Sequence, residues 1–271
     1  MADNRAIGVF DSGLGGLTVA KEIMKLMPYE KIVYFGDTSR IPYGTKSRQT
    51  IKKYAVQDEK FLLSKDVKMI VAACGTVSSV AADTAEQLPV DFIEVVSHSV
   101  KDALKATKNK KIGVLATTAT IKSGAHKKQI LDIEPTATVI ENSATLLVPL
   151  VEEGWNSPED ELVLETLGRY LEPMKQEGVD TVILGCTHFP VLAKAIQKIM
   201  GEDVTLINMG VATASAIKEK LKKTDLLADA TLKEHEFFVS DKTAAFSKTA
   251  SILLGTDFDT TRVETVDVSG L

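Results

Sequence analysis

The sequence predicts an α/β fold, because short apolar segments alternate along its 271 residues with longer amphipathic segments. The short segments are almost continuously apolar, which is typical of strands that helices cover on both faces. Two of these segments, with the loops that follow them, have counterparts later in the chain. Together these observations predict mostly parallel sheets arranged in two related halves.

The first expected strand, at residues 7–10, leads through a small-residue loop at 11–16 into a helix over 18–27. A second helix is expected over residues 47–64, on its amphipathic pattern. Further strands are expected at 31–35, 69–73, 92–96, 112–115, 139–141, 181–184 and 205–207.

Two matched pairs of segments indicate that the halves are related. Ile-Gly-Val-Phe at 7–10 resembles Ile-Gly-Val-Leu at 112–115, and each is followed by a loop of small residues. Cys74 and Cys186 likewise both come directly after an apolar segment. The offsets within the two pairs are similar, at about 105 and about 112 residues, and a near-constant offset is the signature of an internal repeat.

A domain boundary is therefore expected near residues 97–111, just before the second copy of the repeat begins at residue 112. The C-terminal segment is expected to return to the first half. The first domain would then comprise residues 1–97 plus 210–271, and the second would comprise residues 98–209.

Composition and charge restrict the class of protein. Apolar residues make up 44% of the chain and charged residues 25%, as in an ordinary soluble enzyme. No apolar run is long enough to span a membrane and no signal peptide is recognisable, so we expect a cytoplasmic protein without a membrane partner. A net charge of −5 argues against a broad surface for nucleic acid, and no nucleic-acid partner is expected.

The chain has two cysteines, Cys74 and Cys186, which are expected to be free thiols in a reducing compartment. Each lies between an expected strand and an expected helix, and ligands bind at the carboxyl ends of strands in open α/β sheets. The positive end of a helix favours a thiolate there. We interpret both cysteines as reactive, with a small buried apolar residue as the structural alternative.

The glycine-rich loop partly matches a nucleotide-binding motif. Gly13-Leu14-Gly15-Gly16-Leu17-Thr18 begins like a dinucleotide fingerprint, and Asp37 lies about where a ribose-binding acid would. However, Thr18 replaces the third glycine, and Asp11 would repel a pyrophosphate. The loop is better suited to binding a small carboxylate through Ser12 and backbone N–H groups.

Two other chemistries are disfavoured. A zinc site built from Cys74, Cys186 and His188 lacks any Cys-x-x-Cys spacing, so no metal is expected. A single-cysteine nucleophile with His188 or His98 as its base would leave the second, equivalently placed cysteine unexplained.

Five segments of the chain, in the same order, resemble bacterial glutamate racemases of the wider aspartate/glutamate racemase superfamily. They are Asp11-Ser12-Gly-Leu-Gly-Gly-Leu, Gly36-Asp37, Pro42-Tyr43-Gly44, Ala73-Cys74-Gly75-Thr76 and Gly185-Cys186-Thr187-His188-Phe189-Pro190. The resemblance implies two pseudosymmetric α/β domains with the active site at the domain interface. It also implies catalysis without a cofactor, a homodimer, and a role in supplying D-glutamate for peptidoglycan.

The resemblance further implies roles for individual residues. Cys74 and Cys186 would be the two acid/base groups, one removing the α-proton of glutamate while the other protonates the opposite face. A free thiol is mostly protonated at neutral pH, so each needs help. Asp11 would assist Cys74, and His188 would assist Cys186, with Glu152 as a further acidic candidate. Substrate contacts are expected from Asp11, Ser12, Tyr43, Gly44, Gly75, Thr76, Thr187 and His188.

Structural alternatives exist for several of these residues. Asp11 could instead cap the helix that follows it, and His188 could cap a helix or fill space. Glu152 or its neighbour Glu153 could be a solvated loop carboxylate, and residues 42–44 alone would be interpreted as a turn.

Three positions depart from the family pattern. Gly75 stands where the family usually has Asn, Ser97-His98-Ser99 replaces a segment containing Pro-Gly, and Val239-Ser240-Asp241 replaces a Thr-Gly element. Because an Asn would donate a hydrogen bond to substrate, Gly75→Asn is expected to raise kcat/KM for glutamate. The expected gain corresponds to the ~0.5–1.5 kcal/mol that a net hydrogen bond contributes. A racemase or isomerase of the superfamily acting on aspartate or another dicarboxylate, and a weakly active homologue, remain the alternatives.

Overall fold

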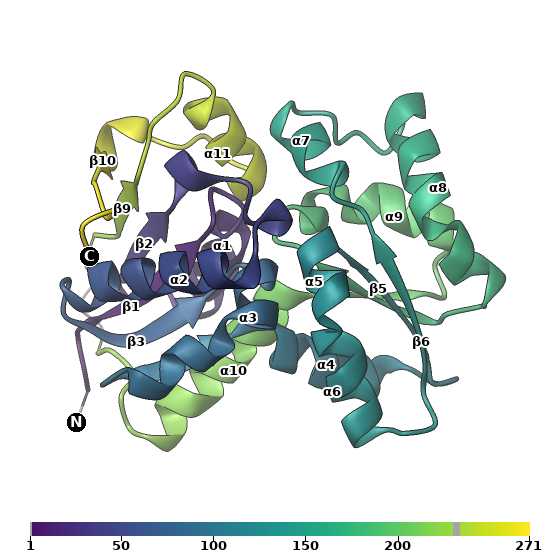
Figure 1. Cartoon of the computed structure of the whole chain (residues 1–271), viewed down its shortest axis with the longest axis horizontal. Coiled ribbons are helices and arrows are strands. Elements are labelled where there is room, and N and C mark those ends of the chain that lie inside the picture. The colour runs from purple at the N-terminus through teal and green to yellow at the C-terminus, as the bar shows by residue number, and fades with distance from the viewer. Residues whose placement is uncertain (1, 230–233) are drawn as a thin grey trace.

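The computed structural model describes residues 2–229 and 234–271. Its strands form two parallel sheets, one of six strands and one of four. Figure 1 shows the two sheets in separate halves that lie side by side. This arrangement confirms the predicted α/β fold with parallel sheets.

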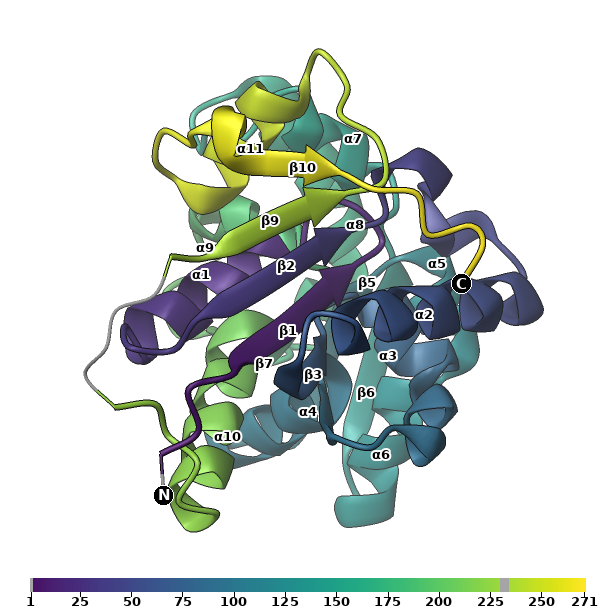
Figure 2. The same cartoon turned by 90° about the vertical axis from the view of Figure 1, so that its left-hand side faces the viewer.

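The first sheet has the strand order β10-β9-β2-β1-β3-β4, and Figure 2 shows the neighbouring strands from β10 to β1. Every neighbouring pair is parallel. Strand β9 pairs with β2, so the C-terminal segment extends a sheet that the N-terminal segment began. The strands are β1 (Ala6–Asp11), β2 (Ile32–Gly36), β3 (Val67–Ala72), β4 (Asp91–Glu94), β9 (Glu236–Val239) and β10 (Val263–Thr265).

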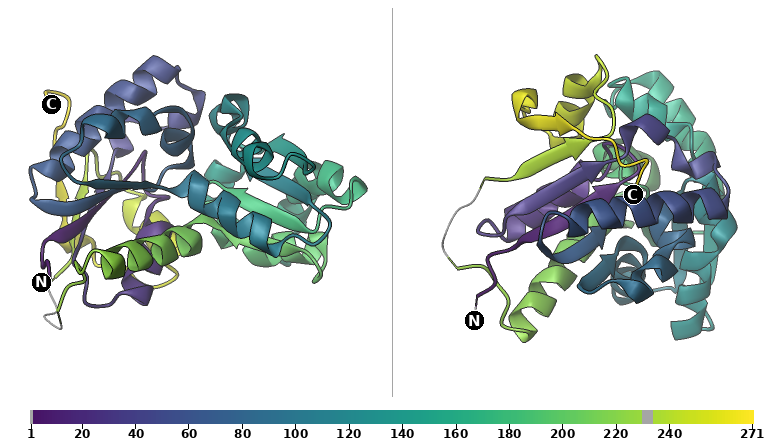
Figure 3. Two further views of the ribbon diagram at one scale, coloured as in Figure 1. Left: turned by 90° about the horizontal axis from the view of Figure 1, so that it is seen from below. Right: turned by 60° about the vertical axis from the view of Figure 1, so that its left-hand side comes forward.

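The second sheet has the order β6-β5-β7-β8 and is also parallel throughout. Figure 3, seen from below, shows it beside the first half. Its strands are β5 (Lys111–Ala116), β6 (Thr138–Ser143), β7 (Thr181–Gly185) and β8 (Thr205–Asn208).

The helices connect these strands. In the first half they are α1 (Leu17–Leu26), α2 (Arg48–Leu63), α3 (Gly75–Val80), α10 (Met209–Lys223) and α11 (Phe246–Leu254). Helix α4 (Val95–Ala106) leads into the second half, which also contains α5 (Thr118–Ser123), α6 (Ala125–Ile133), α7 (Leu147–Glu152), α8 (Glu161–Gln176) and α9 (Ala193–Met200). Helix α10 packs against both α1 and α4. Of the described helices, none combines the length and the apolar character needed to cross a bilayer.

Strand β1 is covered on both faces, as its continuous apolar sequence predicts. Ile7 and Val9 pack in the larger core cluster, which includes the apolar side chains of α1. Ala6 and Phe10 point to the opposite face and pack in the second cluster, which includes the apolar side chains of α2. Successive side chains on a strand point to opposite faces, so a strand buried between two helix layers must be apolar at every position.

The structure differs from the expectation at 92–96. Strand β4 ends at Glu94, and α4 begins at Val95 and continues through the region where a domain boundary was expected. The Glu94 carboxylate accepts hydrogen bonds from the backbone N–H groups of Val96 (2.5 Å) and Ser97 (2.9 Å). This cap satisfies two of the free N–H groups at the helix start, which is why the apolar Val95 and Val96 are helical rather than extended.

The strand register determines where each sheet presents its loops. Phe10 lies opposite Ala72, and the Ala73 N–H donates to the Phe10 carbonyl over 2.9 Å. The residues after β1 and those after β3 therefore emerge side by side. In the second sheet Ala116 lies opposite Gly185, which brings the loops after β5 and β7 together in the same way.

Candidate active site

A cavity of about 530 Å³ lies between the two halves, at the carboxyl ends of β1 and β3 on one side and of β5 and β7 on the other. It brings together most of the residues that the sequence singled out. Those that line it are Ser12, Tyr43, Gly44, Cys74, Gly75, Thr76, Glu152, Cys186, Thr187 and His188. Asp11 is buried and lies behind the wall, outside this set of lining residues.

Cys74 occupies the position before the first turn of α3. Its thiol donates a hydrogen bond to the Ser12 hydroxyl, with 3.4 Å between Sγ and Oγ. Burial, and next the negative charge of Asp11, raise the pKa of Cys74 to about 12. The expectation that the helix would favour a thiolate here is therefore wrong for Cys74, because α3 is a helix of only six residues and desolvation outweighs its field.

Asp11 ends β1 and is fully buried. Its Oδ2 accepts a hydrogen bond from the Gly13 N–H over 3.0 Å, while Oδ1 has no hydrogen-bond partner among the described residues. Burial raises the pKa of Asp11, against the opposing positive charge of His188. The N-cap residue of α1 is Gly16, and no side chain makes a capping hydrogen bond there. Asp11 is therefore not the N-cap of α1.

On the other side of the cavity, Cys186 directly follows β7. Its Sγ lies 3.8 Å from Nδ1 of His188, and Nε2 of His188 lies 3.0 Å from Oε1 of Glu152. Burial lowers the pKa of His188, but the contacts with Cys186 and Glu152 outweigh it and raise this pKa to about 10. The side chain of His188 makes no capping hydrogen bond to the short helix Phe189–Leu192, so capping does not account for the imidazole.

Glu152 ends α7, and its carboxylate reaches His188 from an element far away in sequence. Glu153 is exposed. Of the two neighbouring carboxylates, Glu152 is therefore the one that takes part in the site, and it is not a solvated loop residue.

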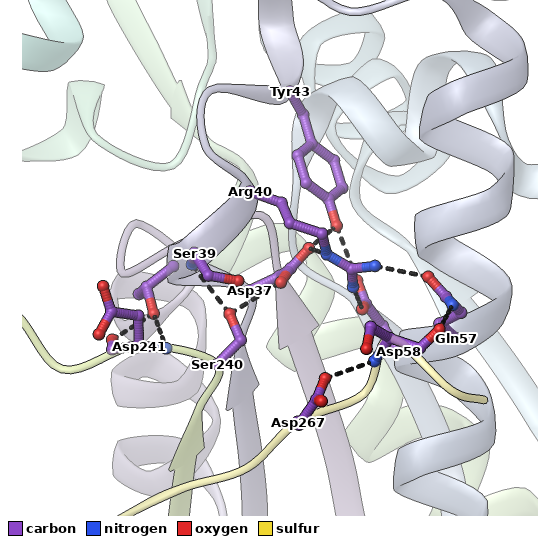
Figure 4. A network of polar contacts seen from close by, with 11 residues as sticks. Asp37, Ser39, Arg40, Tyr43, Gln57, Asp58, Ser240, Asp241 and Asp267 are labelled. Carbon is purple, nitrogen blue, oxygen red and sulfur yellow. Dashed lines mark hydrogen bonds and ion pairs between the residues drawn. The ribbon is translucent and has the colours of Figure 1, made fainter.

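Tyr43 lines the cavity with its buried ring, but its hydroxyl is engaged elsewhere. That hydroxyl contacts the carboxylates of Asp37 and Asp58, as Figure 4 shows. What Tyr43 offers a ligand is consequently its ring and backbone, and its position is tied to a polar network outside the cavity.

Gly75 lines the cavity at a close contact between the two halves. A β-carbon at this position would lie 2.6 Å from the carbonyl oxygen of Gly185, which is closer than two non-bonded atoms approach without displacement. The basis for expecting a gain from Gly75→Asn is therefore removed, because the larger side chain would first have to push this backbone away.

Thr117, at the end of the loop after β5, is a lining residue that the sequence reasoning did not select. Its Oγ1 lies 3.1 Å from Oγ1 of Thr76 and 3.0 Å from Oγ1 of Thr120. The internal repeat could have identified Thr117, because Thr117 follows the first strand of the second half at the position that Ser12 has in the first half. Other lining residues that were not selected are Gly13, Ile41, Pro42, Thr145, Leu146, Val148, Pro149 and Gly185.

His98, considered as an alternative base, lies in α4 and is not among the residues lining the cavity. Within residues 2–229 and 234–271, no three His, Cys, Asp or Glu side chains are grouped so that they could hold a metal ion.

Comparisons with known proteins agree on one family. The model of the Asp/Glu/Hydantoin racemase family matches residues 18–217. The chain is 40% identical over 253 residues to a glutamate racemase of Geobacter metallireducens, covering 93% of each protein. It is 43% identical over 256 residues to one of Neisseria meningitidis serogroup A, again covering 93% of each. The crystal structure of the Francisella tularensis glutamate racemase in complex with D-glutamate matches with a TM-score of 0.91 and 38% identity, covering 99% of this chain and 100% of that one.

Proposed function

The chain belongs to the Asp/Glu/Hydantoin racemase family and, within it, to the glutamate racemases, which are isomerases (EC 5.1.1.3), and we propose that it interconverts L- and D-glutamate with two thiols and no cofactor. One observation carries the proposal: Cys74 and Cys186 line a single cavity from the ends of strands in two different sheets. Inversion of an α-carbon requires a base on one face and an acid on the other, and two thiols on separate halves can supply both.

Cys186 is assigned as the base that removes the first proton. Its Sγ lies 3.8 Å from Nδ1 of His188, and the other ring nitrogen of His188 lies 3.0 Å from Oε1 of Glu152, which favours the charged form of His188. The thiolate removes the α-proton: the Cα–H bond breaks, an S–H bond forms, and the electron pair is delocalised into the α-carboxylate.

Cys74 is the acid in the resting protein. With a pKa near 12 it holds its proton at neutral pH, and the charge of Asp11 helps to keep that proton in place. The S–H bond breaks as a new Cα–H bond forms on the opposite face, which leaves a thiolate on Cys74. The reverse reaction uses the same two thiols with their roles exchanged.

The cavity would hold the substrate mainly through neutral donors. Among the described lining residues none is Lys or Arg, so the two carboxylates of glutamate would be bound by hydroxyls and backbone N–H groups. Ser12, Thr76, Thr117 and Thr187 supply the hydroxyls. Tyr43, Gly44 and Gly75 would contribute backbone and shape. The D-glutamate bound to the Francisella tularensis relative supports this substrate class.

The cellular role and assembly are proposed on the family resemblance. The D-glutamate would be used for peptidoglycan, the protein would act in the cytoplasm, and it would be a homodimer. The division into 1–97 plus 210–271 and 98–209 also stays a proposal.

The test is α-proton exchange in D₂O. The protein is incubated with L-glutamate, D-glutamate and L-aspartate in turn, loss of the α-proton signal is followed by NMR, and the enantiomer formed is measured by polarimetry. We expect exchange and inversion with both enantiomers of glutamate. Exchange with aspartate alone would replace glutamate by aspartate as the substrate.

The two thiols are tested separately by Cys74→Ser and Cys186→Ser. Each variant should lose about 10²–10⁴-fold in kcat, the usual contribution of a general acid or base. Circular dichroism checks that each variant is folded. A folded variant that keeps the parent rate would show that its thiol takes no part in the proton transfer.

A further inference from the structure

A polar network, drawn in Figure 4, holds the hydroxyl of Tyr43. Tyr43 forms one wall of the cavity together with Ile41, Pro42 and Gly44. The centre of the network is Arg40, the last residue of the short helix Thr38–Arg40. Around it lie two carboxylates, Asp37 after β2 and Asp58 on α2, whose side chains are fully buried. Charged groups are rarely buried to this extent unless they are paired.

Arg40 pairs with both carboxylates through different nitrogen atoms. Its Nε donates to Asp37 Oδ2 over 2.6 Å, and its Nη2 donates to Asp58 Oδ1 over 3.0 Å. Nη1 donates to the side-chain oxygen of Gln57, and the guanidinium lies 4.1 Å above the centre of the Tyr54 ring. A planar guanidinium can make these contacts at once, whereas a lysine ammonium has neither the fork nor the flat face.

The same two carboxylates hold Tyr43. Its hydroxyl donates to Asp37 Oδ2 and lies 3.2 Å from Asp58 Oδ2. Asp37 is also bound from the C-terminal segment, because the Ser240 hydroxyl donates to its Oδ1 over 2.8 Å while accepting from the Ser39 N–H over 2.9 Å. Gln57 donates to the Ser269 carbonyl over 2.8 Å. The network thus joins three separate parts of the first half to one wall of the cavity.

We infer that Arg40 is a positioning residue for the reaction: through Asp37 and Asp58 it holds Tyr43, and with it residues 41–44, in place against the bound amino acid. This inference rests on the proposed function for its catalytic meaning. Arg40 is not among the residues that line the cavity, so it acts through Tyr43 and not by contact with substrate. Burial, and then the charge of Asp37, raise the pKa of Asp58, while the charge of Arg40 lowers it, so the guanidinium opposes the repulsion between the two acids.

The test compares Arg40→Lys with Tyr43→Phe and with the double variant. Because a misplaced wall weakens substrate binding, Arg40→Lys should raise the KM for glutamate about tenfold and change kcat much less. A merely structural role would reduce the folded fraction, which lowers the apparent kcat and leaves KM unchanged. If Arg40 acts through Tyr43, the effects on KM are not additive in the double variant.

Arg169→Lys is the matched control, because Arg169 is exposed and pairs with Glu165 one helical turn away. Its KM should equal that of the parent. An unchanged KM in Arg40→Lys, or fully additive effects with Tyr43→Phe, would overturn the inference.

Hydrogen exchange separates this result from failure of the proposed function. The backbone amides of residues 38–46 should exchange faster in Arg40→Lys than in the parent, while those of α8 should not change. This readout does not need substrate turnover. Unchanged exchange at 38–46 would overturn the positioning role even if the protein proved to act on another amino acid.

Discussion

At the scale of single residues, Cys74 and Cys186 occupy similar places but have neighbours of opposite charge. Cys74 is buried beside the carboxyl group of Asp11, and its pKa is raised to about 12. Cys186 instead contacts His188, whose pKa is raised to about 10 by Cys186 and Glu152 despite the opposing effect of burial. The two thiols therefore have different electrostatic surroundings, which suits the proposed reaction, in which one thiol acts as the base and the other as the acid.

The first residue-scale prediction concerns pH. His188 lines the cavity and, while charged, stabilises the negative charge that develops on the substrate as the α-proton leaves, so kcat/KM should fall as the pH rises through about 10, the pKa of His188. Glu152→Gln removes a carboxylate that raises this pKa, and the alkaline fall should therefore begin at lower pH. The measurement is the pH profile of kcat/KM from neutral to strongly alkaline solution.

Glu153→Gln is the control, because Glu153 is the next residue and is exposed. Its alkaline limb should coincide with that of the parent. An alkaline limb in Glu152→Gln that does not move would mean that Glu152 has no electrostatic effect on His188.

The second residue-scale prediction concerns Gly75. A β-carbon there would lie 2.6 Å from the Gly185 carbonyl, so Gly75→Ala should displace the loops that carry the two thiols. A shift of this kind is expected to lower kcat/KM about tenfold or more, and Gly75→Asn should do the same. Steady-state kinetics with L-glutamate provide the measurement.

Gly168→Ala is the matched control, because no heavy atom lies within 4 Å of the place its β-carbon would take and Gly168 is inside α8. That variant should be as active as the parent and more stable by about 0.5–1 kcal/mol. If Gly75→Ala is fully active, the close contact with Gly185 is not needed for the reaction.

At the scale of elements, a buried ion pair joins three segments of the first half. The Lys68 side chain, on β3, is fully buried, and its Nζ lies 2.7 Å from Glu30 Oε2. The same ammonium donates to the carbonyls of Asp3 over 2.7 Å and Leu226 over 2.8 Å. Glu30 Oε1 accepts from the Ala228 N–H over 2.9 Å. The Lys68–Glu30 pair therefore connects β3 with three other segments: the N-terminal segment, the α1–β2 connection and the segment after α10.

This contact predicts a large effect on stability. Lys68→Met leaves the Glu30 carboxylate buried without its cation and should lower the free energy of unfolding by about 3–5 kcal/mol. The double variant with Glu30→Gln should recover part of this loss. Urea unfolding followed by circular dichroism measures both.

An exposed pair gives the comparison. Lys128 and Asp132 lie 2.7 Å apart on the surface of α6, and Lys128→Met should change the free energy of unfolding by less than about 1 kcal/mol. Equal effects of Lys68→Met and Lys128→Met would refute the view that burial makes the Lys68 pair important.

At the scale of the whole molecule, the two halves approach each other through glycines around the cavity. A β-carbon at Gly15 would lie 2.1 Å from Thr187 Oγ1, and one at Gly44 would lie 3.2 Å from Thr117 Cβ. With Gly75, these positions let loops of the first half lie directly on loops of the second. The glycine-rich loop that resembled a nucleotide-binding motif thus serves, in part, as a contact between the halves.

Most strands and the fold class could be predicted from the sequence. The inner strands of both sheets are largely apolar segments, and the loops after β1 and β7 carry the Asp-Ser-Gly and Gly-Cys-Thr-His patterns. Strands β9 and β10 were not predicted, because they have only four and three residues and no periodic pattern to distinguish them. The assignment of 92–96 as one strand was wrong at its end, because the Glu94 cap starts a helix there.

What the sequence determined by itself is local: the order of strands and helices, and the loops in which thiols, acids and hydroxyls stand at strand ends. These features depend on neighbouring residues, whose spacing can be read directly. The tertiary structure decided which of these loops face one another. Only packing brings Glu152 to His188, Thr117 to Thr76, and Arg40 between Asp37 and Asp58. It also decided the protonation of Cys74, because burial outweighs the field of a short helix, and burial is a property of the folded chain rather than of its local sequence.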